Sequence, residues 1–483
     1  MNTMVLWIIA IYLAALPIIG LWARFRVREN SLSDYYLAGG MLGAIPLFLT
    51  LYATQYSGNT LFGFAGNAYR NGPVMLFSAA GMAAVLLAYL VFGKKLNALA
   101  KQYNFITPVD YIRHRYKNNL LVLLLNLIFI FALGSYVLTN FKAVGHLSSQ
   151  LTDNALAPAY AIFGLAAIMA FYESMGGMRS VVWTDMLQGV LLLIGSLGII
   201  ICVLVMFGGV GALTQQLAEN PNPNWPDFGA RSWINGFSTI ILFGCSISLY
   251  PHAIQRIYAA RNWPSLRASF IFMAFMPFVV TLPIVVSAMA AGLVLPPIPT
   301  GETDQVIPRL LDFLAQSVPA LNVFLAVFMA AVLAAIMSTM DSAMLSLGAI
   351  FNNDFIRPNF PNLSQARLAK IGRTLSWVLM FAMAYAALIL PQDIWSLVVL
   401  KLDLLAQAFP ILIVGVLLPF VGARAAIAGL AAGVLVVITL RFNLITIDTM
   451  GIHAGVVGLA ANFGMMALAH FIRKSEWFNP QTD

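Results

Sequence analysis

The sequence predicts an all-α integral membrane protein with about thirteen transmembrane helices. Of its 483 residues, 61% are apolar and only 9% are charged, and the mean hydropathy is +0.87. Soluble globular proteins carry roughly 25% charged residues, so a water-soluble fold of this size could not cover so much apolar surface. These values exclude a secreted, cytosolic or disordered protein.

The apolar runs set the expected spans. A bilayer core of about 30 Å needs about 20 apolar residues per helix. β-Barrel strands would instead alternate over about ten residues, whereas Ala79–Phe92 and Leu191–Phe207 are nearly unbroken apolar runs. We expect helices near 3–23, 42–69, 74–93, 120–150, 157–172, 182–208, 234–255, 268–295, 318–351, 372–390, 393–420, 425–440 and 452–472.

The basic residues predict the orientation, because cytoplasmic loops collect Lys and Arg. One side is expected to hold twenty of them: Arg24, Arg26, Arg28, Lys94, Lys95, Lys101, Arg113, Arg115, Lys117, Arg179, Arg256, Arg261, Arg267, Arg357, Arg367, Lys370, Arg373, Arg424, Arg473 and Lys474. The other side holds four: Arg70, Arg231, Arg309 and Arg441. The N-terminus is therefore predicted outside and the C-terminus in the cytoplasm. The net charge of +8 needs no nucleic-acid partner.

Five ionisable side chains fall inside predicted spans: Lys142, Asp185, Asp341, Lys401 and Asp403. Each costs ~2.5–3.5 kcal/mol on insertion scales, so each is a candidate functional residue. Asp185, near the cytoplasmic start of its span, is alternatively an interfacial carboxylate. Lys401 and Asp403 are two residues apart on one helix and do not face each other, so for these we expect snorkelling or pairing between helices.

Two predicted spans contain polar interruptions. The second span contains ATQYSGNT over residues 53–60, and the seventh contains GCSISLYP over residues 244–251. Glycine and hydroxyl or amide side chains compete with the helical ladder, and non-helical backbone at this depth survives only where it lines a cavity or is buried in protein. Two interrupted spans five helices apart predict an inverted-repeat transporter that binds solute at the breaks. A pair of ordinary kinks is the alternative.

The ninth span carries a stripe of small and hydroxyl residues on one face, with Asp341 beside it. The stripe consists of Ala335, Ser338, Thr339, Ser342 and Ser346, spaced as one side of a helix. Hydroxyls and freed carbonyls are ligands that a hard monovalent cation prefers. The alternative is that small residues let helices pack closely, with their hydroxyls bonded one turn back.

Four segments make the chain resemble the solute:sodium symporter family, which includes sodium-coupled proline, pantothenate, sialic acid and sugar symporters. They are residues 53–58, 62–72, 176–185 and 334–342. The resemblance covers nearly the whole chain. It implies a leucine-transporter-like fold whose second to eleventh helices form a five-plus-five inverted repeat. The domains would be residues 1–41, a transport core over 42–421 with repeats near 42–208 and 234–420, and two added helices with a tail over 422–483.

The resemblance also implies ion sites. The common sodium site of the family would fall on the carbonyls of Ala53, Tyr56 and Ala335 and the hydroxyls of Ser338 and Thr339. A second cation site, present in some members, would fall on Asp185, Ser338, Asp341 and Ser342. Two carboxylates there would strengthen a cation site, or one could be protonated and serve proton coupling.

The implied solute site comprises Gln55, Ser57, Gly58, Lys142, Phe243 and Ile247. Proline symporters carry Asp at the position of Gln55 and an aromatic residue at that of Ile247, so proline is not the expected solute. Residues 57–72 look more like pantothenate and monocarboxylate carriers. Lys142 lies in a span that lines the cavity in this fold; it would receive a substrate carboxylate, pair with Asp185 or Asp341, or snorkel.

The function predicted is sodium-coupled symport, by alternating access, of a small organic solute such as pantothenate, a monocarboxylate or an amino acid. Sodium is the co-transported ion, and the expected location is a bacterial inner membrane, as a monomer or weak oligomer. A proton-coupled carrier is the alternative, and a channel is disfavoured by the discrete breaks. No enzyme is expected, because the five histidines (His114, His146, His252, His453 and His470) are scattered and form no metal-binding or catalytic motif.

Overall fold

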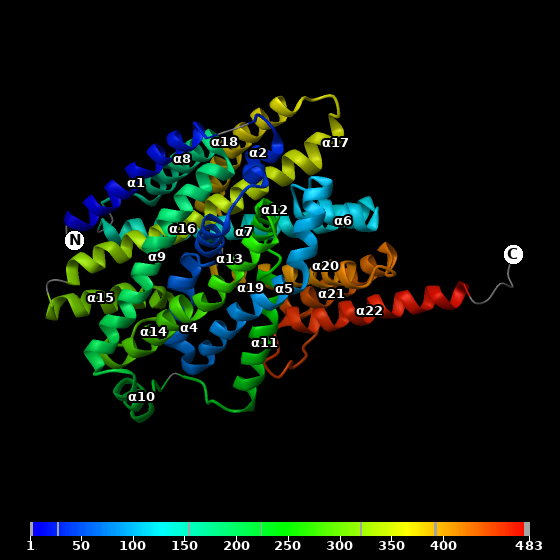
Figure 1. Cartoon of the computed structure of the whole chain (residues 1–483). Coiled ribbons are helices and arrows are strands. Elements are labelled where there is room, and N and C mark those ends of the chain that lie inside the picture. The colour runs from blue at the N-terminus through cyan, green and yellow to red at the C-terminus, as the bar shows by residue number, and fades with distance from the viewer. Residues whose placement is uncertain are drawn as a thin grey trace.

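Helices packed side by side make up the protein (Figure 1). The computed structural model describes residues 3–26, 29–152, 155–223, 225–318, 321–390 and 394–477, and these contain no β-strand, only an isolated bridge between Leu42 and Ala260. Parts of four predicted features lie outside the described residues: Arg28 of the first basic loop, positions 319–320 and 393 of two spans, and the end of the tail at 478–483.

The helices of the first half are α1 (Thr3–Arg24), α2 (Leu32–Leu37), α3 (Ala44–Gln55), α4 (Phe64–Asn71), α5 (Phe77–Tyr103), α6 (Pro108–Tyr116), α7 (Asn119–Leu151), α8 (Pro158–Gly176), α9 (Met178–Phe207) and α10 (Val210–Glu219). Those of the second half are α11 (Ala230–Ile247), α12 (Pro251–Ala259), α13 (Trp263–Met276), α14 (Leu282–Val294), α15 (Val306–Ser317), α16 (Leu321–Ala349), α17 (Arg357–Asn359), α18 (Gln365–Ile389), α19 (Ile394–Ala406), α20 (Phe409–Leu417), α21 (Ala423–Arg441) and α22 (Ala454–Trp477). π-Helical turns at Asn59–Gly63, Pro277–Thr281 and Ile350–Ile356 interrupt three of the longer runs.

The predicted spans all correspond to helices in the structure. By length and composition, the described residues hold 11 helices able to cross a membrane, or 12 if the bent pair α11 and α12 is one span. The 12-residue α3 is shorter than this criterion requires. The count of thirteen, the orientation and the division into domains therefore stay predictions.

Both predicted helix breaks are confirmed. α3 ends at Gln55, Tyr56 adopts an extended conformation (φ −102°, ψ 94°), and the chain returns to helix through a π-helical turn. The second break separates α11 from α12, which are bent by 55°. There Pro251 begins α12, a position that proline favours because the first turn needs no N–H donor. These breaks expose main-chain groups in the middle of the bundle.

The long central helix α16 is the core of the bundle. It is buried along most of its length and packs against α7 and α9, with α1 covering α8, α9 and α16. α21 and α22 form a hairpin at one edge, and α22 extends beyond the bundle toward the C-terminus (Figure 1). The breaks of α3 and α11–α12 thus lie against α16, which also contacts α3 and α12.

Gly177 makes the sharp turn between α8 and α9. Its φ of +54° and ψ of −133° are accessible to glycine alone, and an added Cβ would collide with the carbonyl oxygen of Tyr35. We expect Gly177→Ala to cost about 1–3 kcal/mol and to lower the melting temperature of the purified protein. Gly164→Ala on α8, where a Cβ meets nothing within 4 Å, is the control; equal melting temperatures for the two variants would contradict this account.

Candidate functional site

Main-chain carbonyls at the end of α3 meet hydroxyls of α16. The hydroxyl of Ser338 lies 2.8 Å from the carbonyl oxygen of Ala53, and that of Thr339 lies 3.3 Å from the carbonyl of Thr54. Both hydroxyls also reach the carbonyl of Ala335, at 3.1 and 3.0 Å. The last carbonyls of a helix receive no hydrogen bond from their own helix. The C-terminal end of α3 therefore presents free carbonyl oxygens to α16.

Four of the five predicted sodium ligands are therefore brought together: Ala53, Ala335, Ser338 and Thr339 are all buried. Tyr56, the fifth, is the buried residue directly after α3. The alternative interpretation of the stripe, in which its hydroxyls bond one turn back and the helices pack closely, is also fulfilled, because both hydroxyls reach the carbonyl of Ala335. The hydroxyls of Ser338 and Thr339 thus both join α16 to α3 and belong to the cluster of oxygen atoms.

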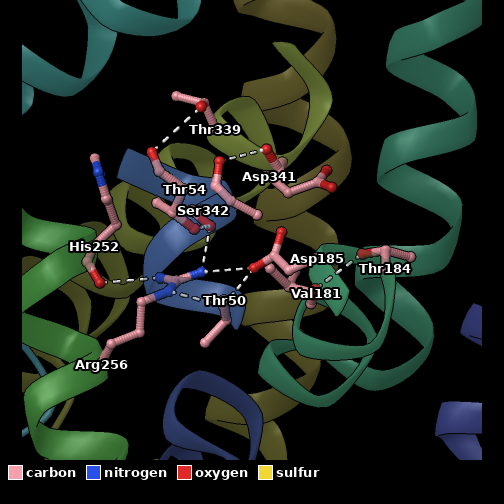
Figure 2. A network of polar contacts seen from close by, with 12 residues as sticks. Thr50, Thr54, Val181, Thr184, Asp185, His252, Arg256, Thr339, Asp341 and Ser342 are labelled. Carbon is pink, nitrogen blue, oxygen red and sulfur yellow. Dashed lines mark hydrogen bonds and ion pairs between the residues drawn. The ribbon is translucent and has the colours of Figure 1, made fainter. Parts of the chain in front are cut away.

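Arg256 is fully buried, so its predicted place in a cytoplasmic loop is wrong. It lies on α12, and its exposed fraction is 0%. Figure 2 shows its guanidinium between α3, α9 and α16. It donates to the hydroxyl of Thr50 at 3.0 Å, to Ser342, and to the carbonyl of His252 one turn back at 3.0 Å, and it pairs with Asp185 at 3.3 Å. The predicted seventh span ended one residue too early to include it.

The four residues predicted as a second cation site are divided among three groups, of which Ser338 with the α3 carbonyls is the one described above. Asp185 is buried, so its interfacial interpretation is wrong; it accepts from Thr50 and Arg256. Ser342 contacts Arg256 and lies 2.9 Å from the hydroxyl of Thr54. Asp341 instead accepts from the hydroxyl of Tyr172. Each carboxylate keeps one buried oxygen, Oδ1, without a hydrogen-bond partner among the described residues.

A cavity of about 730 Å³ lies next to the break in α3. Of the predicted solute residues, Gln55, Ser57, Phe243 and Ile247 line it. Gly58 does not; it allows close approach to α16, because an added Cβ would collide with Ile336. The remaining wall residues come from α4, α5, α7, α11 and α19, and from segments between helices: Thr60, Phe64, Asn67, Asn71, Val74, Met75, Met82, Tyr136, Pro226, Asp227, Gly229, Ala230, Arg231, Ser232, Asn235, Thr239, Leu242, Tyr250, Val398, Val399, Lys401, Leu402, Gly451 and His453.

Lys142 does not line this cavity, which corrects its predicted place in the solute site. Its ammonium donates to the carbonyl of Leu390 at 2.6 Å. The α7 residue that lines the cavity is Tyr136, and a residue six positions further is turned by about 240° around the helix axis. Of its two predicted carboxylate partners, Asp185 binds Arg256 and Asp341 binds Tyr172.

Lys401 lines the cavity and is 1% exposed, so the expectation that it snorkels is wrong. The predicted pairing between helices is confirmed for Asp403, which lies 3.3 Å from Arg441 of α21 and accepts from the amide of Gly455 at 2.9 Å. Glu173, which no sequence pattern singled out, is fully buried on α8 beyond the predicted end of its span and accepts a hydrogen bond from Ser376 at 2.7 Å.

The sequence profile described as the sodium:solute symporter family matches residues 35–433. The chain belongs to this family. This sodium:solute symporter accordingly couples sodium, as the co-transported ion, to transport of a small solute, and it is not an enzyme.

The similar proteins agree with this membership. An uncharacterized symporter of Bacillus subtilis (strain 168) is 24% identical, over 93% of each chain. The sodium/pantothenate symporter of Escherichia coli (strain K12) is 30% identical over 245 residues, about half of each chain. A solved structure of a Na⁺-coupled sialic acid symporter, in a substrate-bound outward-open state, covers 98% of this chain and 98% of its own at 18% identity, with a TM-score of 0.80. The predicted leucine-transporter-like fold class is thereby confirmed.

The buried pair of Asp185 and Arg256 predicts strong coupling between two substitutions. Removing one partner of such a pair leaves an uncompensated charge and costs ~3–5 kcal/mol. We expect Asp185→Asn and Arg256→Gln each to lower the melting temperature of the symporter, and the double variant to lose less than the sum of the two. Additive losses in this double-mutant cycle would mean that the two side chains do not interact.

Proposed function

We propose that sodium binds between α3 and α16, and that its inward movement drives import of a small organic solute held in the adjacent cavity. The proposed ligands are the carbonyls of Ala53, Tyr56 and Ala335 and the hydroxyls of Ser338 and Thr339. The carrying observation is that oxygen atoms from segments 285 residues apart in sequence lie within 2.8 Å of each other at a helix break.

The donor set suits sodium chemically. Hard monovalent cations exchange their water shell for neutral oxygen ligands, and every proposed ligand is a carbonyl or a hydroxyl. Ser338 and Thr339 can rotate their O–H bonds away from the carbonyls. Their lone pairs and the released carbonyl oxygens would then face the same ion.

The shape of the cavity supports an outward-facing state. Residues of the predicted outer loops line its rim, including Asp227, Arg231 and Gly451. At the predicted cytoplasmic side, Arg113 of α6 pairs with Asp110 at 2.6 Å and with Asp354, beyond α16, at 3.1 Å. The ion pair with Asp354 ties α6 to the segment that follows the central helix, as expected if that side is closed.

Coupling follows from the shared position of the two ligands. Sodium would hold α3 against α16, which keeps Gln55 and Ser57 at the cavity wall, so each ligand stabilises the conformation that the other needs. The membrane potential adds about 2.3 kcal/mol per charge per 100 mV. Uptake that follows pH and ignores sodium would favour the proton-coupled alternative.

The second predicted cation site requires a rearrangement. A cation held by Asp185, Ser338, Asp341 and Ser342 would have to displace the guanidinium of Arg256 from Ser342. We therefore propose that this site forms only in a conformation where α12 has moved, and that Arg256 supplies the positive charge beside Asp185 in the present one.

The location and assembly are proposals too. We propose that the symporter lies in a bacterial inner membrane with its N-terminus outside and its C-terminus in the cytoplasm, as a monomer or weak oligomer. Its bacterial relatives and the asymmetry of basic residues support this placement. Without Arg256, the sequence still predicts nineteen basic residues in cytoplasmic loops against four outside.

Removing either hydroxyl from the proposed sodium site tests it directly. We expect Ser338→Ala and Thr339→Ala each to weaken sodium binding by about tenfold or more, because a lost ligand to a charged group is worth roughly 1.5–3 kcal/mol. The measurement is the sodium concentration that half-maximally raises the melting temperature. Thr184→Ala is the matched control, since that hydroxyl donates to Ser180 and Val181 of its own helix. Unchanged sodium dependence in both site variants would remove the assignment.

A further inference from the structure

The cavity contains one buried charged side chain. Among the described residues that line it, three carry a formal charge, and two of them, Asp227 and Arg231, are exposed at the rim. Arg231 pairs there with Asp448 at 3.0 Å. The third is Lys401, which lies on α19 inside the cavity and is 1% exposed. The interior of the solute cavity is therefore cationic.

The ammonium of Lys401 is held by aromatic rings rather than by a carboxylate. It lies 3.8 Å from the ring centroid of Tyr136 and 5.4 Å from that of Tyr250, and the two rings stack on each other at 5.2 Å. Cation–π contacts stabilise an ammonium only in part. The structure gives Lys401 no hydrogen bond or ion pair with any described residue, whereas buried cations are ordinarily paired.

The neighbouring carboxylate is committed elsewhere. Asp403 is two positions further along α19 and so points to the opposite side of the helix. It accepts from the amide of Gly455 and lies 3.3 Å from Arg441. No described residue supplies the charge that would balance Lys401, which leaves the contents of the cavity to supply it.

We propose that Lys401 binds the carboxylate of the transported solute, which is a net-anionic organic acid rather than a zwitterionic amino acid. This rests on the proposed function, because it assigns the solute of that same cavity. A zwitterion would need a buried carboxylate for its ammonium group, and the cavity's one acidic lining residue among those described, Asp227, is at the exposed rim.

The rest of the wall fits the remainder of such a molecule. Phe64 and Phe243 stack at 5.7 Å and, with Ile247, form an apolar wall. Gln55 Oε1 and Asn67 Nδ2 are buried without hydrogen-bond partners among the described residues, which leaves an acceptor and a donor for a hydroxyl or amide group. The inferred solute has one carboxylate, an apolar segment and a neutral polar group.

Pairs of compounds in which a neutral group replaces the carboxylate test the inference on the full-length purified symporter. The probes are pantothenate against panthenol and lactate against lactamide, with proline as the zwitterion, each titrated in saturating sodium with the melting temperature as readout. We expect at least one carboxylate to stabilise the protein while its neutral partner and proline do not. Stabilisation by proline or a neutral compound alone, or equally by both members of a pair, would overturn the inference.

Variants of Lys401 separate its role from general stability. Lys401→Gln should weaken the stabilising carboxylate about tenfold or more, with sodium binding in the absence of solute retained. Lys142→Gln, which removes a lysine outside the cavity, should change that affinity less than about twofold. If Lys401→Gln does not fold, Lys401→Arg decides: it keeps the charge and should keep the preference for the carboxylate over its neutral partner. Wild-type affinity in Lys401→Gln, or lost preference in Lys401→Arg, would overturn the inference.

The two proposals fail differently. If sodium does not stabilise the wild-type protein with or without these compounds, the proposed sodium site is wrong. If sodium stabilises the protein and neither carboxylate adds to the effect, the sodium site stands and the carboxylate assignment falls.

Discussion

The need to satisfy main-chain carbonyls at a helix break inside the membrane shapes the centre of this symporter. No water is available in the hydrocarbon core, so an interrupted helix must find partners in its neighbours. α16 supplies them with Ser338 and Thr339, and Gly58 lets the backbone approach it. In the sodium site proposed above, the same carbonyls that are costly to leave unpaired would become ligands once a cation replaces the hydroxyl protons. That site would be a consequence of how the break is stabilised.

The ion pair of Asp185 and Arg256 connects this break to the second one. Arg256 lies on the short helix that follows the break after α11, while Thr50, which it also contacts, lies on α3 one turn before the other break. Movement of α12 would therefore change contacts at α3, α9 and α16 together (Figure 2). A buried group of linked hydrogen bonds of this kind is bistable rather than gradually deformable, which suits a carrier that alternates between two states.

Local patterns predicted the breaks and the hydroxyl stripe, because glycine, proline and hydroxyl residues act on their own backbone. Burial at helix ends was not predictable in that way. Glu173 and Arg256 each lie one residue past an expected span, and only the elements packed over them bury them. The positions of Lys142 and Lys401 were wrongly predicted for a different reason. α7 and α19 are apolar on most sides, so the periodicity of the sequence does not tell which face meets the cavity. The sequence predicted Lys142 at the cavity, whereas in the structure Lys401 lines it.

The buried charges of this protein differ in whether the protein itself neutralises them. Asp185 and Asp403 have cationic partners from other helices, and such pairs fix helices in place. Lys401 has aromatic rings instead. An internal carboxylate would compete with an incoming anion for the same ammonium, whereas a ring lowers the cost of burying the charge and leaves its hydrogen-bond donors available. A transporter must also release what it binds. An ammonium that aromatic rings stabilise in part is therefore better suited to transient binding of an anion than an ammonium paired with a carboxylate or one without any stabilising contact.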